Sequence, residues 1–413
     1  MKTNHRFASL GLVTLAWLSS LVAAPPSAKD ITVTPDVQAV ANSNNAFACD
    51  LFSQLGASGG NLFYSPTSIS TALAMCYAGA GGDTAEQMAK ALHFSLPGVR
   101  LHPAFARFTT ILNDAGTPPA YQISVANALW TQLGFPLQPG FLEIMKRDYG
   151  AEEHAVDFKQ DVEAARQTIN KWVASQTRDR IKDLLAQGSV QPDVRLVLTN
   201  AIYFKGDWLS PFKKEGTYAQ DFHITAEKTA KANMMHQTEF AQYAEDGDKK
   251  LLELPYKGGT LTMVFVLPTK KFDLPSIERQ LSARAVADWI GLLKPEQVRV
   301  AIPKVKMNTG FELSKVLSAM GMAKAFTMQA DFRPMANVPG EPLYIGQVIH
   351  KAFLAVDELG TEAAAATAVT MRAGSAAPRQ LKEFTADQPF LFFIRDRRTG
   401  AILFLGRCTE PGQ

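Results

Sequence analysis

The segment DELGTEAAAATAVTMRAGSAAP, from Asp357 to Pro378, is the most informative part of this sequence. Its long run of very small side chains fits an alanine-rich helix, a flexible linker or a strand that enters a narrow space. At a period of two residues, one set of alternate positions carries only apolar or hydroxyl side chains, as in a strand with one buried face. These positions are Thr361, Ala363, Ala365, Thr367, Val369 and Met371.

The same segment has divided conformational preferences. Glu362 to Ala366 is excellent helix material, and intrinsic propensity alone favours a helix there over a strand. Thr367, Val369 and Thr370 are β-branched and favour a strand. A segment with both preferences is a candidate for two conformational states. It also forms a long connection between two strand-like runs, and connections of that length usually carry function.

Strand-like runs surround this segment and dominate the second half of the chain. Arg195 to Phe204 is almost entirely apolar, which predicts a strand buried on both faces of a sheet. Thr260 to Pro268 has the same character. Pro389 to Arg407 contains two apolar runs joined by RRTG, which predicts a hairpin with Gly400 in its turn.

Helix signals dominate the first half of the chain. Val37 to Leu55 places its apolar residues on one helical face. Ser65–Pro66 offers a cap residue followed by proline at the first helical position. Asp83 with Glu86 matches a capping box, and Asp161 precedes another helical pattern. Helices come early and strands late without regular alternation, so we expect one large α+β unit and not a doubly wound sheet.

The composition is that of an ordinary globular protein. The chain has 413 residues, of which 46% are hydrophobic and 20% charged. Length alone suggests about two or three domains. The net charge of +3 is too small to indicate nucleic acid as a partner. The densest basic pairs are short, and each is predicted to be a solvated turn: Lys213–Lys214, Lys249–Lys250 and Arg397–Arg398.

The first 28 residues match an export signal. Lys2 and Arg6 are followed by an apolar stretch from about Phe7 to Ala24 and then by small residues. We therefore expect residues 1–28 to be removed, with the cut between 23 and 28, and the product to be secreted or periplasmic. An N-terminal membrane anchor is the alternative. No other run approaches the roughly 18 apolar residues that a membrane span requires.

Residues that resemble chemical motifs give no convincing enzyme site. Ser58 lies in a G-x-S-x-G pattern, but a helical pattern precedes it and an apolar run follows, the reverse of a nucleophile elbow. The histidines show no metal-binding spacing. His350 lies in an apolar strand-like run, where a hydrogen-bonded core histidine is favoured over a catalytic base. Three cysteines are interpreted as buried small hydrophobes: Cys49, Cys76 and Cys408.

Four motifs, in order, resemble the serpin family over nearly the whole mature chain. Asn61 to Met88 resembles the second-helix region of that family, and Asn200 to Phe212 its central strand and breach. Val356 to Ala368 resembles its hinge, and Ala386 to Arg407 its C-terminal signature. The opening segment is therefore identified as resembling a serpin reactive-centre loop, at about residues 358–385.

The resemblance implies a fold and a mechanism. Residues 29–413 would form a single α+β domain with three β-sheets, about nine helices and an exposed loop, against the expectation from length. The protein would be a monomeric suicide inhibitor and not an enzyme. A target protease cuts the loop and forms an acyl-enzyme, and the loop then enters the main sheet as a new strand, which distorts the protease before deacylation.

The resemblance also assigns residues to roles. Hinge positions lie at the start of the loop, where Gly360 can bend the chain and small side chains can be buried; they are Glu358, Gly360, Thr361, Glu362, Ala363, Ala364, Ala365 and Ala366. Shutter positions would hold the central strands together until they part; they are Ser65, Ser68, Asn200 and His350. Trp208 matches the breach, where insertion starts.

The position of the scissile bond suggests the target protease. Serpin loops are usually cut about seventeen residues along, counted from the hinge glutamate, which gives the bond between Gly374 and Ser375. Small residues there favour elastase-like or subtilisin-like serine proteases. Arg372 would instead attract trypsin-like enzymes and Met371 chymotrypsin-like ones. A cysteine protease is a further alternative.

Two other expectations follow from the resemblance. Residues 100–114 hold only Arg100 and Arg107 as firm cations, so no polysaccharide or other cofactor is expected. A serpin-fold carrier or chaperone without inhibitory activity is the competing function. Such proteins often place proline or charge at the inward hinge positions, and the positions Thr361, Ala363 and Ala365 carry neither.

Overall fold

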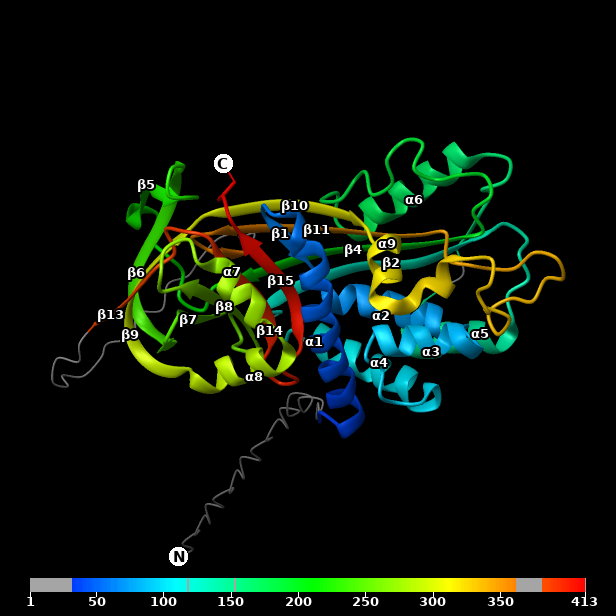
Figure 1. Ribbon diagram of the computed structural model, residues 1–413, viewed down its shortest axis with the longest axis horizontal. Helices are drawn as coiled ribbons and strands as arrows, with labels where there is room; N and C mark the ends of the chain where they lie inside the picture. Colours follow the sequence, from blue (N-terminus) through cyan, green and yellow to red (C-terminus); the bar gives the residue numbers. More distant parts are fainter. Residues whose placement is uncertain (1–31, 117–118, 152–153, 362–380, 413) are drawn as a thin grey trace, which may run out of the picture. The chain divides into compact units, whose positions relative to one another are not determined.

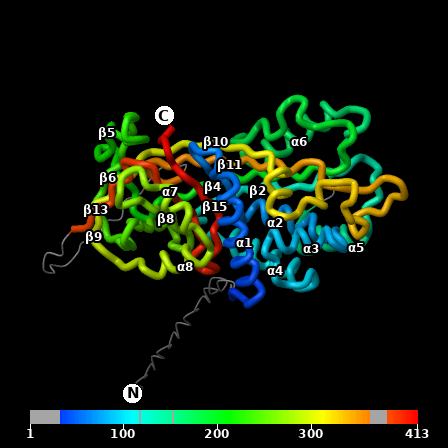
Figure 2. The backbone as a smooth tube through the Cα atoms, viewed as in Figure 1, coloured from blue at the N-terminus to red at the C-terminus, as the bar shows by residue number. Residues whose placement is uncertain are grey.

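The computed structural model describes residues 32–116, 119–151, 154–361 and 381–412 (Figures 1 and 2). Contacts join Val33–Gln413 into one unit, separate from Met1–Thr32. The predicted signal peptide lies outside the described residues and stays a prediction. Over the described ranges, no helix combines the length and the apolar character that crossing a bilayer requires.

Side-chain caps mark the starts of four of the helices in the described residues, α1, α2, α6 and α8. Ser65 accepts a hydrogen bond from the Ser68 backbone with proline at the first helical position, and Asp161 accepts one from the Ala164 backbone at 2.9 Å, as predicted. The capping box at Asp83 and Glu86 is wrong. That helix begins at Gly82, because the Asp83 carboxylate pairs with Lys324 and does not turn back to the backbone.

Nine α-helices fall within the described residues. They are α1 (Pro35–Leu55), α2 (Pro66–Tyr77), α3 (Gly82–Ala91), α4 (Gly98–Asn113), α5 (Pro139–Ile144), α6 (Val162–Gln176), α7 (Leu274–Gln280), α8 (Ala283–Leu292) and α9 (Ser314–Leu317). Short 3₁₀ or π turns follow several of them.

A six-stranded sheet holds the segments that matter for function. Its order is β10 (Val305–Glu312), β11 (Gln347–Asp357), β12 (Gly360–Thr361), β4 (Leu196–Asp207), β2 (Tyr121–Gln132) and β3 (His154–Val156). Figure 1 shows α6 on one side of this sheet and α2 on the other. Because helices cover both faces, nearly every residue of β4 is buried, as its apolar sequence predicts.

A nine-stranded sheet packs beside it. Its order is β1 (Leu62–Tyr64), β15 (Ile402–Cys408), β14 (Phe390–Asp396), β8 (Leu261–Pro268), β7 (Lys249–Pro255), β6 (Thr229–Asp246), β9 (Lys294–Pro303) and β13 (Lys382–Thr385), and β5 (Thr217–His223) pairs with β6. The predicted hairpin is confirmed as β14–β15, with Gly400 at φ +72° in the turn.

The α+β architecture agrees with the expectation, but the number of sheets differs from the expected three. The described strands form two hydrogen-bonded sheets. The strand β6 is 18 residues long and pairs with β5 and β9 along one part and with β7 along the other. Two of the expected sheets are therefore continuous through β6.

Candidate functional site

The hinge has already begun a strand inside the six-stranded sheet. Gly360 and Thr361 pair with the end of β11 on one side and with the end of β4 on the other. Further along, β11 and β4 pair directly in parallel, from Gln347–Phe353 to Val197–Tyr203. We call the line along which β11 and β4 meet the seam. The two-residue strand β12 is a wedge at one end of this seam, and along the rest of it β11 and β4 pair directly.

The side chain of Thr361 is held in a buried pocket under the breach. It is fully buried, and its hydroxyl shares a hydrogen bond of 2.8 Å with the hydroxyl of Tyr256. The ring of Tyr256 stacks on Trp208 with centroids 4.6 Å apart. Trp208 donates from its indole to the carbonyl of Asp357 at 3.1 Å and from its backbone to that of Leu359 at 2.8 Å. Trp208 therefore binds the backbone of the hinge at two carbonyl groups, those of Asp357 and Leu359.

Gly360 fits between the strands only because it has no side chain. Its φ is +148°, which L side chains rarely adopt. A Cβ atom at this position would lie 2.2 Å from the carbonyl oxygen of Gly206 and 2.6 Å from the Cα of Asp207. Both contacts are with the backbone of β4, which cannot rotate away.

Replacing Gly360 with alanine is therefore expected to push β12 out of the sheet. The amide protons of Gly360 and Thr361 should exchange with solvent at least about fivefold faster, since a lost ladder hydrogen bond costs about 1 kcal/mol or more. Hydrogen exchange with mass spectrometry measures this directly. Gly340→Ala is the matched control, because Gly340 has φ +79° but nothing within 4 Å of its added Cβ. Unchanged exchange rates of the hinge amides in Gly360→Ala would contradict the position of β12 between β11 and β4.

Glu358 anchors the root of the loop. Its carboxylate is buried and lies 2.9 Å from the ammonium group of Lys304, and its carbonyl accepts from the backbone of Phe212 at 2.8 Å. Burial works to raise the pKa of Glu358, but the hydrogen bonds to its carboxylate, that from Lys304 foremost, and the charge of Lys304 together outweigh burial and hold the pKa below its ordinary value. The residue is therefore charged and fixed in place at neutral pH.

The predicted shutter residues meet in one buried network across three strands. His350 on β11 is in register with Asn200 on β4, which is in register with Asn127 on β2. The side-chain oxygen of Asn200, Oδ1, accepts from Nδ1 of His350. The side-chain nitrogen, Nδ2, donates to Oγ of Ser68 at 2.6 Å and to Oδ1 of Asn127. The backbone N–H of Ser65 donates to Nε2 of His350 at 3.2 Å. Sheet and helix α2 are thereby joined at the centre of the seam.

The bonds to His350 fix its protonation state. Nε2 accepts from a backbone N–H, so the single ring proton must be on Nδ1, which donates to Asn200. The ring is completely buried, and this burial lowers the pKa of His350 to about 3. His350 is therefore a neutral, hydrogen-bonded core histidine, as the sequence favoured.

Acidification is expected to destabilise the protein through this residue. The pKa of His350 is about 3 in the folded protein and 6.5 ordinarily, so between these values the unfolded chain binds more protons. The free energy of unfolding should therefore fall with falling pH across this window, by up to about 1.4 kcal/mol per pH unit for one residue. Urea unfolding at several pH values measures the slope.

The matched variant for this prediction is His350→Gln, which removes the titrating group. Burial also lowers the pKa of His102 to about 4 and raises that of Glu239 to about 7. Both residues contribute to the slope in both proteins, so the difference between the two slopes isolates His350. A shallower slope in His350→Gln is expected, and identical slopes in the two proteins would contradict the assignment.

Three residues of the site were not predicted from the sequence. Asn127 completes the shutter, Tyr256 lines the Thr361 pocket, and Lys304 pairs with Glu358. Asn127 gave the one usable signal, since an amide within the apolar run Val125 to Trp130 requires a polar partner. The remaining predicted positions lie outside the described residues: Glu362, Ala363, Ala364, Ala365, Ala366, Met371, Arg372, Gly374 and Ser375.

Ser58 and the cysteines have structural positions. Ser58 ends a turn between α1 and β1, and its hydroxyl donates to the carbonyl of Leu55 at 3.0 Å. Cys49, Cys76 and Cys408 are free and buried, as predicted, and burial raises the pKa of the first two to about 12. Within the described ranges, no three His, Cys, Asp or Glu side chains are grouped to hold a metal ion.

Comparison with known proteins gives consistent matches. A family model described as Serpin (serine protease inhibitor) matches residues 42–411. An uncharacterized serpin-like protein of Thermococcus kodakarensis is 42% identical over 390 residues, which cover 94% of this chain and 89% of that protein. The leukocyte elastase inhibitor of Homo sapiens is 39% identical over 389 residues, which cover 91% of this chain and 100% of the inhibitor.

Solved structures show the same architecture. A crystal structure of maspin matches with a TM-score of 0.84 and 28% identity, over 92% of this chain and 100% of that one. Uncleaved ovalbumin matches with a TM-score of 0.81 and 31% identity, over 90% of this chain and 100% of that one.

Proposed function

The chain belongs to the serpin family, and from this premise we propose that it inhibits serine endopeptidases as a suicide substrate. The family comprises protease inhibitors rather than enzymes, and this chain is not an enzyme. In the proposed reaction a protease cuts the loop after β12 and remains attached as its acyl-enzyme. The cut loop then enters between β11 and β4 and distorts the protease before deacylation.

The state of the hinge is the observation that supports this proposal. Gly360 and Thr361 already pair with both neighbouring strands, so the first step of insertion costs no further ordering at these positions. Each further residue that enters would break direct hydrogen bonds between β11 and β4 and would form hydrogen bonds to β11 on one side and to β4 on the other. Each net hydrogen bond is worth about 0.5–1.5 kcal/mol, against about 1–2 kcal/mol for ordering a residue. The balance therefore requires additional burial and strain in the uncut protein.

The proposed target has a preference for small side chains. The predicted bond Gly374–Ser375 suits elastase-like or subtilisin-like enzymes, and several relatives are named leukocyte elastase inhibitor. There are three alternatives: cleavage after Arg372 by a trypsin-like enzyme, cleavage after Met371 by a chymotrypsin-like enzyme, and cleavage elsewhere by a cysteine protease. We propose that the protein acts as a monomer.

One experiment tests both the mechanism and the bond. The purified protein is incubated separately with elastase, subtilisin and trypsin, and the products are separated on a denaturing gel. A covalent complex and a released C-terminal peptide are expected, and the N-terminus of the peptide identifies the bond. Cleavage without a complex, and without a rise in thermal stability, would favour the carrier or chaperone alternative.

We further propose that the protein is exported. Residues 1–28 carry the basic start and the apolar stretch of a signal peptide. Expression of the full chain followed by N-terminal sequencing of the exported product should give a start between residues 24 and 29. Retention of the intact N-terminus in a membrane fraction would favour an anchor.

A further inference from the structure

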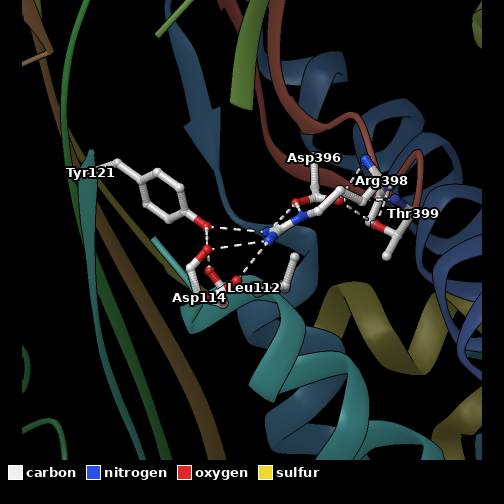
Figure 3. A network of polar contacts seen from close by, with 7 residues as sticks. Leu112, Asp114, Tyr121, Asp396, Arg398 and Thr399 are labelled. Atoms are coloured by element: carbon white, nitrogen blue, oxygen red, sulfur yellow. Dashed lines mark hydrogen bonds and ion pairs between the residues drawn. The ribbon is translucent and has the colours of Figure 1, made fainter. Parts of the chain in front are cut away.

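A buried carboxylate at the β14–β15 hairpin is held by a cation (Figure 3). Asp396 is completely buried, and Arg398 donates to its carboxylate at 2.6 and 2.8 Å. Arg398 also donates to the hydroxyl of Tyr121 at 3.1 Å and to the carbonyl of Asp114 at 3.2 Å. The pair Arg397–Arg398 is thus no solvated turn: the second arginine compensates the buried charge and fixes the end of α4 and the start of β2 to the hairpin.

Glu239 is a carboxyl group at an inward position of β6. Alternate residues of a strand face opposite sides of the sheet, and the residues on the side of Glu239 are buried or half-buried. These residues are Met235, Gln237, Ala241 and Tyr243. The side chain of Gln237 donates to Oε1 of Glu239 at 2.7 Å, and Val298 of β9 lies opposite in the register. Glu239 is itself half-buried and, unlike Asp396, forms no ion pair with any residue that the structure describes.

The surroundings of Glu239 favour its neutral form. Burial raises the pKa of Glu239 from its ordinary value of 4.5 to about 7, and the hydrogen bonds from Ser210 and Gln237 offset this only in part. Within the described ranges, no charged side chain contributes to the shift. The charged groups on the neighbouring elements are paired elsewhere or exposed: Arg299 with Glu383, Lys304 with Glu358, Lys257 with Asp207, and the exposed Lys213, Lys214 and Glu215. Glu239 is therefore neutral at mildly acidic pH and becomes charged as the pH passes about 7.

One edge of β6 has an unpaired stretch at the level of Glu239. On this edge, β5 pairs with residues 229–235 and β7 pairs with residues 242–246. The strand β9 pairs along the opposite edge, and among the described strands none pairs with residues 236–241 on this one. The chain between β4 and β5 lies against the unpaired stretch, and we call its residues 209–216 the breach segment.

Three side chains of β6 hold the breach segment in place. The amide group of Gln237 donates to the carbonyl of Ser210 at 3.4 Å, and the side chain of Ser210 hydrogen-bonds to Glu239. At the other end of the segment, Nδ1 of His236 donates to the carbonyl of Gly216 at 3.0 Å. An imidazole keeps this donor when it is protonated, so the bond from His236 persists when the ring titrates. Of the three contacts, only that of Glu239 changes its character with pH.

The breach segment in turn holds the hinge. The backbone N–H of Phe212 donates to the carbonyl of Glu358 at 2.8 Å, and that of Trp208, directly before the segment, donates to the carbonyl of Leu359 at 2.8 Å. A charged Glu239 gains hydration when it leaves its half-buried position, and the breach segment covers it there. Movement of the segment away from β6 withdraws a backbone donor from the root of the loop.

We propose that Glu239 is a pH-sensitive latch, which in its neutral form holds the breach segment against β6 and in its charged form releases the segment and loosens the hinge. The closed arrangement, in which the pKa of Glu239 is about 7, binds more protons than an open one in which Glu239 regains its ordinary value of 4.5. The stabilisation of the closed arrangement is therefore complete below about pH 4.5, is lost as the pH rises to about 7, and changes no further above that. The latch concerns the uncut protein, so it goes beyond the proposed inhibition and does not depend on it.

Hydrogen exchange with mass spectrometry tests the latch on the intact protein at about pH 5.5 and about pH 7.5. Protection is expressed relative to unstructured peptides of the same sequence, which removes the intrinsic effect of pH on exchange. In the wild type, the protection of residues 209–216 and of Gly360 and Thr361 should be at least about tenfold lower at the higher pH. Glu239→Gln stays neutral and should show equal protection at the two pH values.

Glu215→Gln is the matched control, because it removes an exposed carboxylate from the same segment and should respond to pH like the wild type. His350 acts in the opposite direction and is present in all three proteins, so it does not separate them. Equal protection of the wild type at both pH values, or the same fall in Glu239→Gln as in the wild type, overturns the latch.

Ser210→Ala gives a readout that a purely structural role of Glu239 would not change. The substitution removes a hydrogen bond that lowers the pKa of Glu239, so protection should continue to fall above about pH 7, where that of the wild type has levelled off. If Glu239→Gln does not fold, this shift alone decides the proposal. An unchanged pH profile in Ser210→Ala overturns it.

Discussion

Thr361→Arg is expected to abolish the proposed inhibition and to leave the protein an ordinary substrate of any protease that cuts its loop. Thr361 is completely buried between β11 and β4, where its hydroxyl bonds to Tyr256. An arginine there would place a charge in a pocket lined by the rings of Tyr256 and Trp208, and leaving such a charge unpaired costs several kcal/mol. Insertion would slow, so the acyl-enzyme would be hydrolysed before the loop could distort the protease.

The measurement is the fraction of cleaved inhibitor that ends as covalent complex on a denaturing gel. We expect a fall of at least about tenfold, since each 1.4 kcal/mol on the insertion barrier changes the ratio of the two rates tenfold. Thr361→Ser keeps the hydroxyl and should behave like the wild type. Thr229→Arg adds the same charge at an exposed position at the start of β6 and should also have no effect. Undiminished complex formation by Thr361→Arg would refute the insertion mechanism.

Asn200→Ala should give the second largest effect, on stability. The side chain is fully buried and bonds to three partners, His350, Ser68 and Asn127. Its removal leaves the Nδ1–H of His350 without a partner, at about 1–3 kcal/mol, whereas Ser68 and Asn127 keep the hydrogen bonds between them. We expect the free energy of unfolding to fall by about 1–3 kcal/mol. A synthetic peptide of sequence TEAAAATAVTMR, which copies residues 361–372, should anneal faster to the uncut protein because β11 and β4 are less firmly held together.

Denaturant unfolding and the annealing rate measure the two parts of this prediction. Asn308→Ala is the matched control, because Asn308 lies on β10 of the same sheet with its side chain exposed. Its unfolding free energy should change by less than about 0.5 kcal/mol. A stable Asn200→Ala that anneals the peptide no faster would show that the shutter does not hold the strands together.

Local signals in the sequence were sufficient for most elements. Ser65 and Asp161 cap helices because a cap needs only a side chain and the next turn of backbone. Asp83 has the same local signal, but a distant partner, Lys324, takes its carboxylate. Apolar runs located β4, β8 and the β14–β15 hairpin, since burial on both faces leaves little room for polar residues.

The site depended on information that is not local. His350, Asn200, Ser65 and Ser68 were assigned through family resemblance, and periodicity alone would have left them as core and cap residues. Asn127 was missed because its role follows from the register of β2 against β4, which places it directly opposite Asn200. Register is set by whole strands and their packing, so a single position does not reveal it.

The Thr361 pocket illustrates the same point for side chains. Tyr256 follows β7, about a hundred residues before the hinge, and nothing in its neighbourhood marks it as a partner of Thr361. Tyr256 reaches Thr361 because it forms a β-bridge with Trp208, and the backbone N–H of Trp208 donates to the carbonyl of Leu359 in the hinge. Sequence analysis could assign Trp208 to the breach, but the residue that supports it was set by the tertiary structure.

The place of β15 bears on how the protein is made. This strand is the last in the chain, yet it lies between β1 and β14, and the carbonyl of Leu403 accepts from the hydroxyl of Ser65 at 2.7 Å. At about 5–20 residues per second, a ribosome would finish the loop segment before it makes the strands that complete the core. The loop's far end is fixed by β13, which pairs with β9 in parallel. The residues synthesised after the loop thus fix its far end through β13 and complete the core through β15, whereas the partners of its near end, Lys304 and Trp208, are made before it.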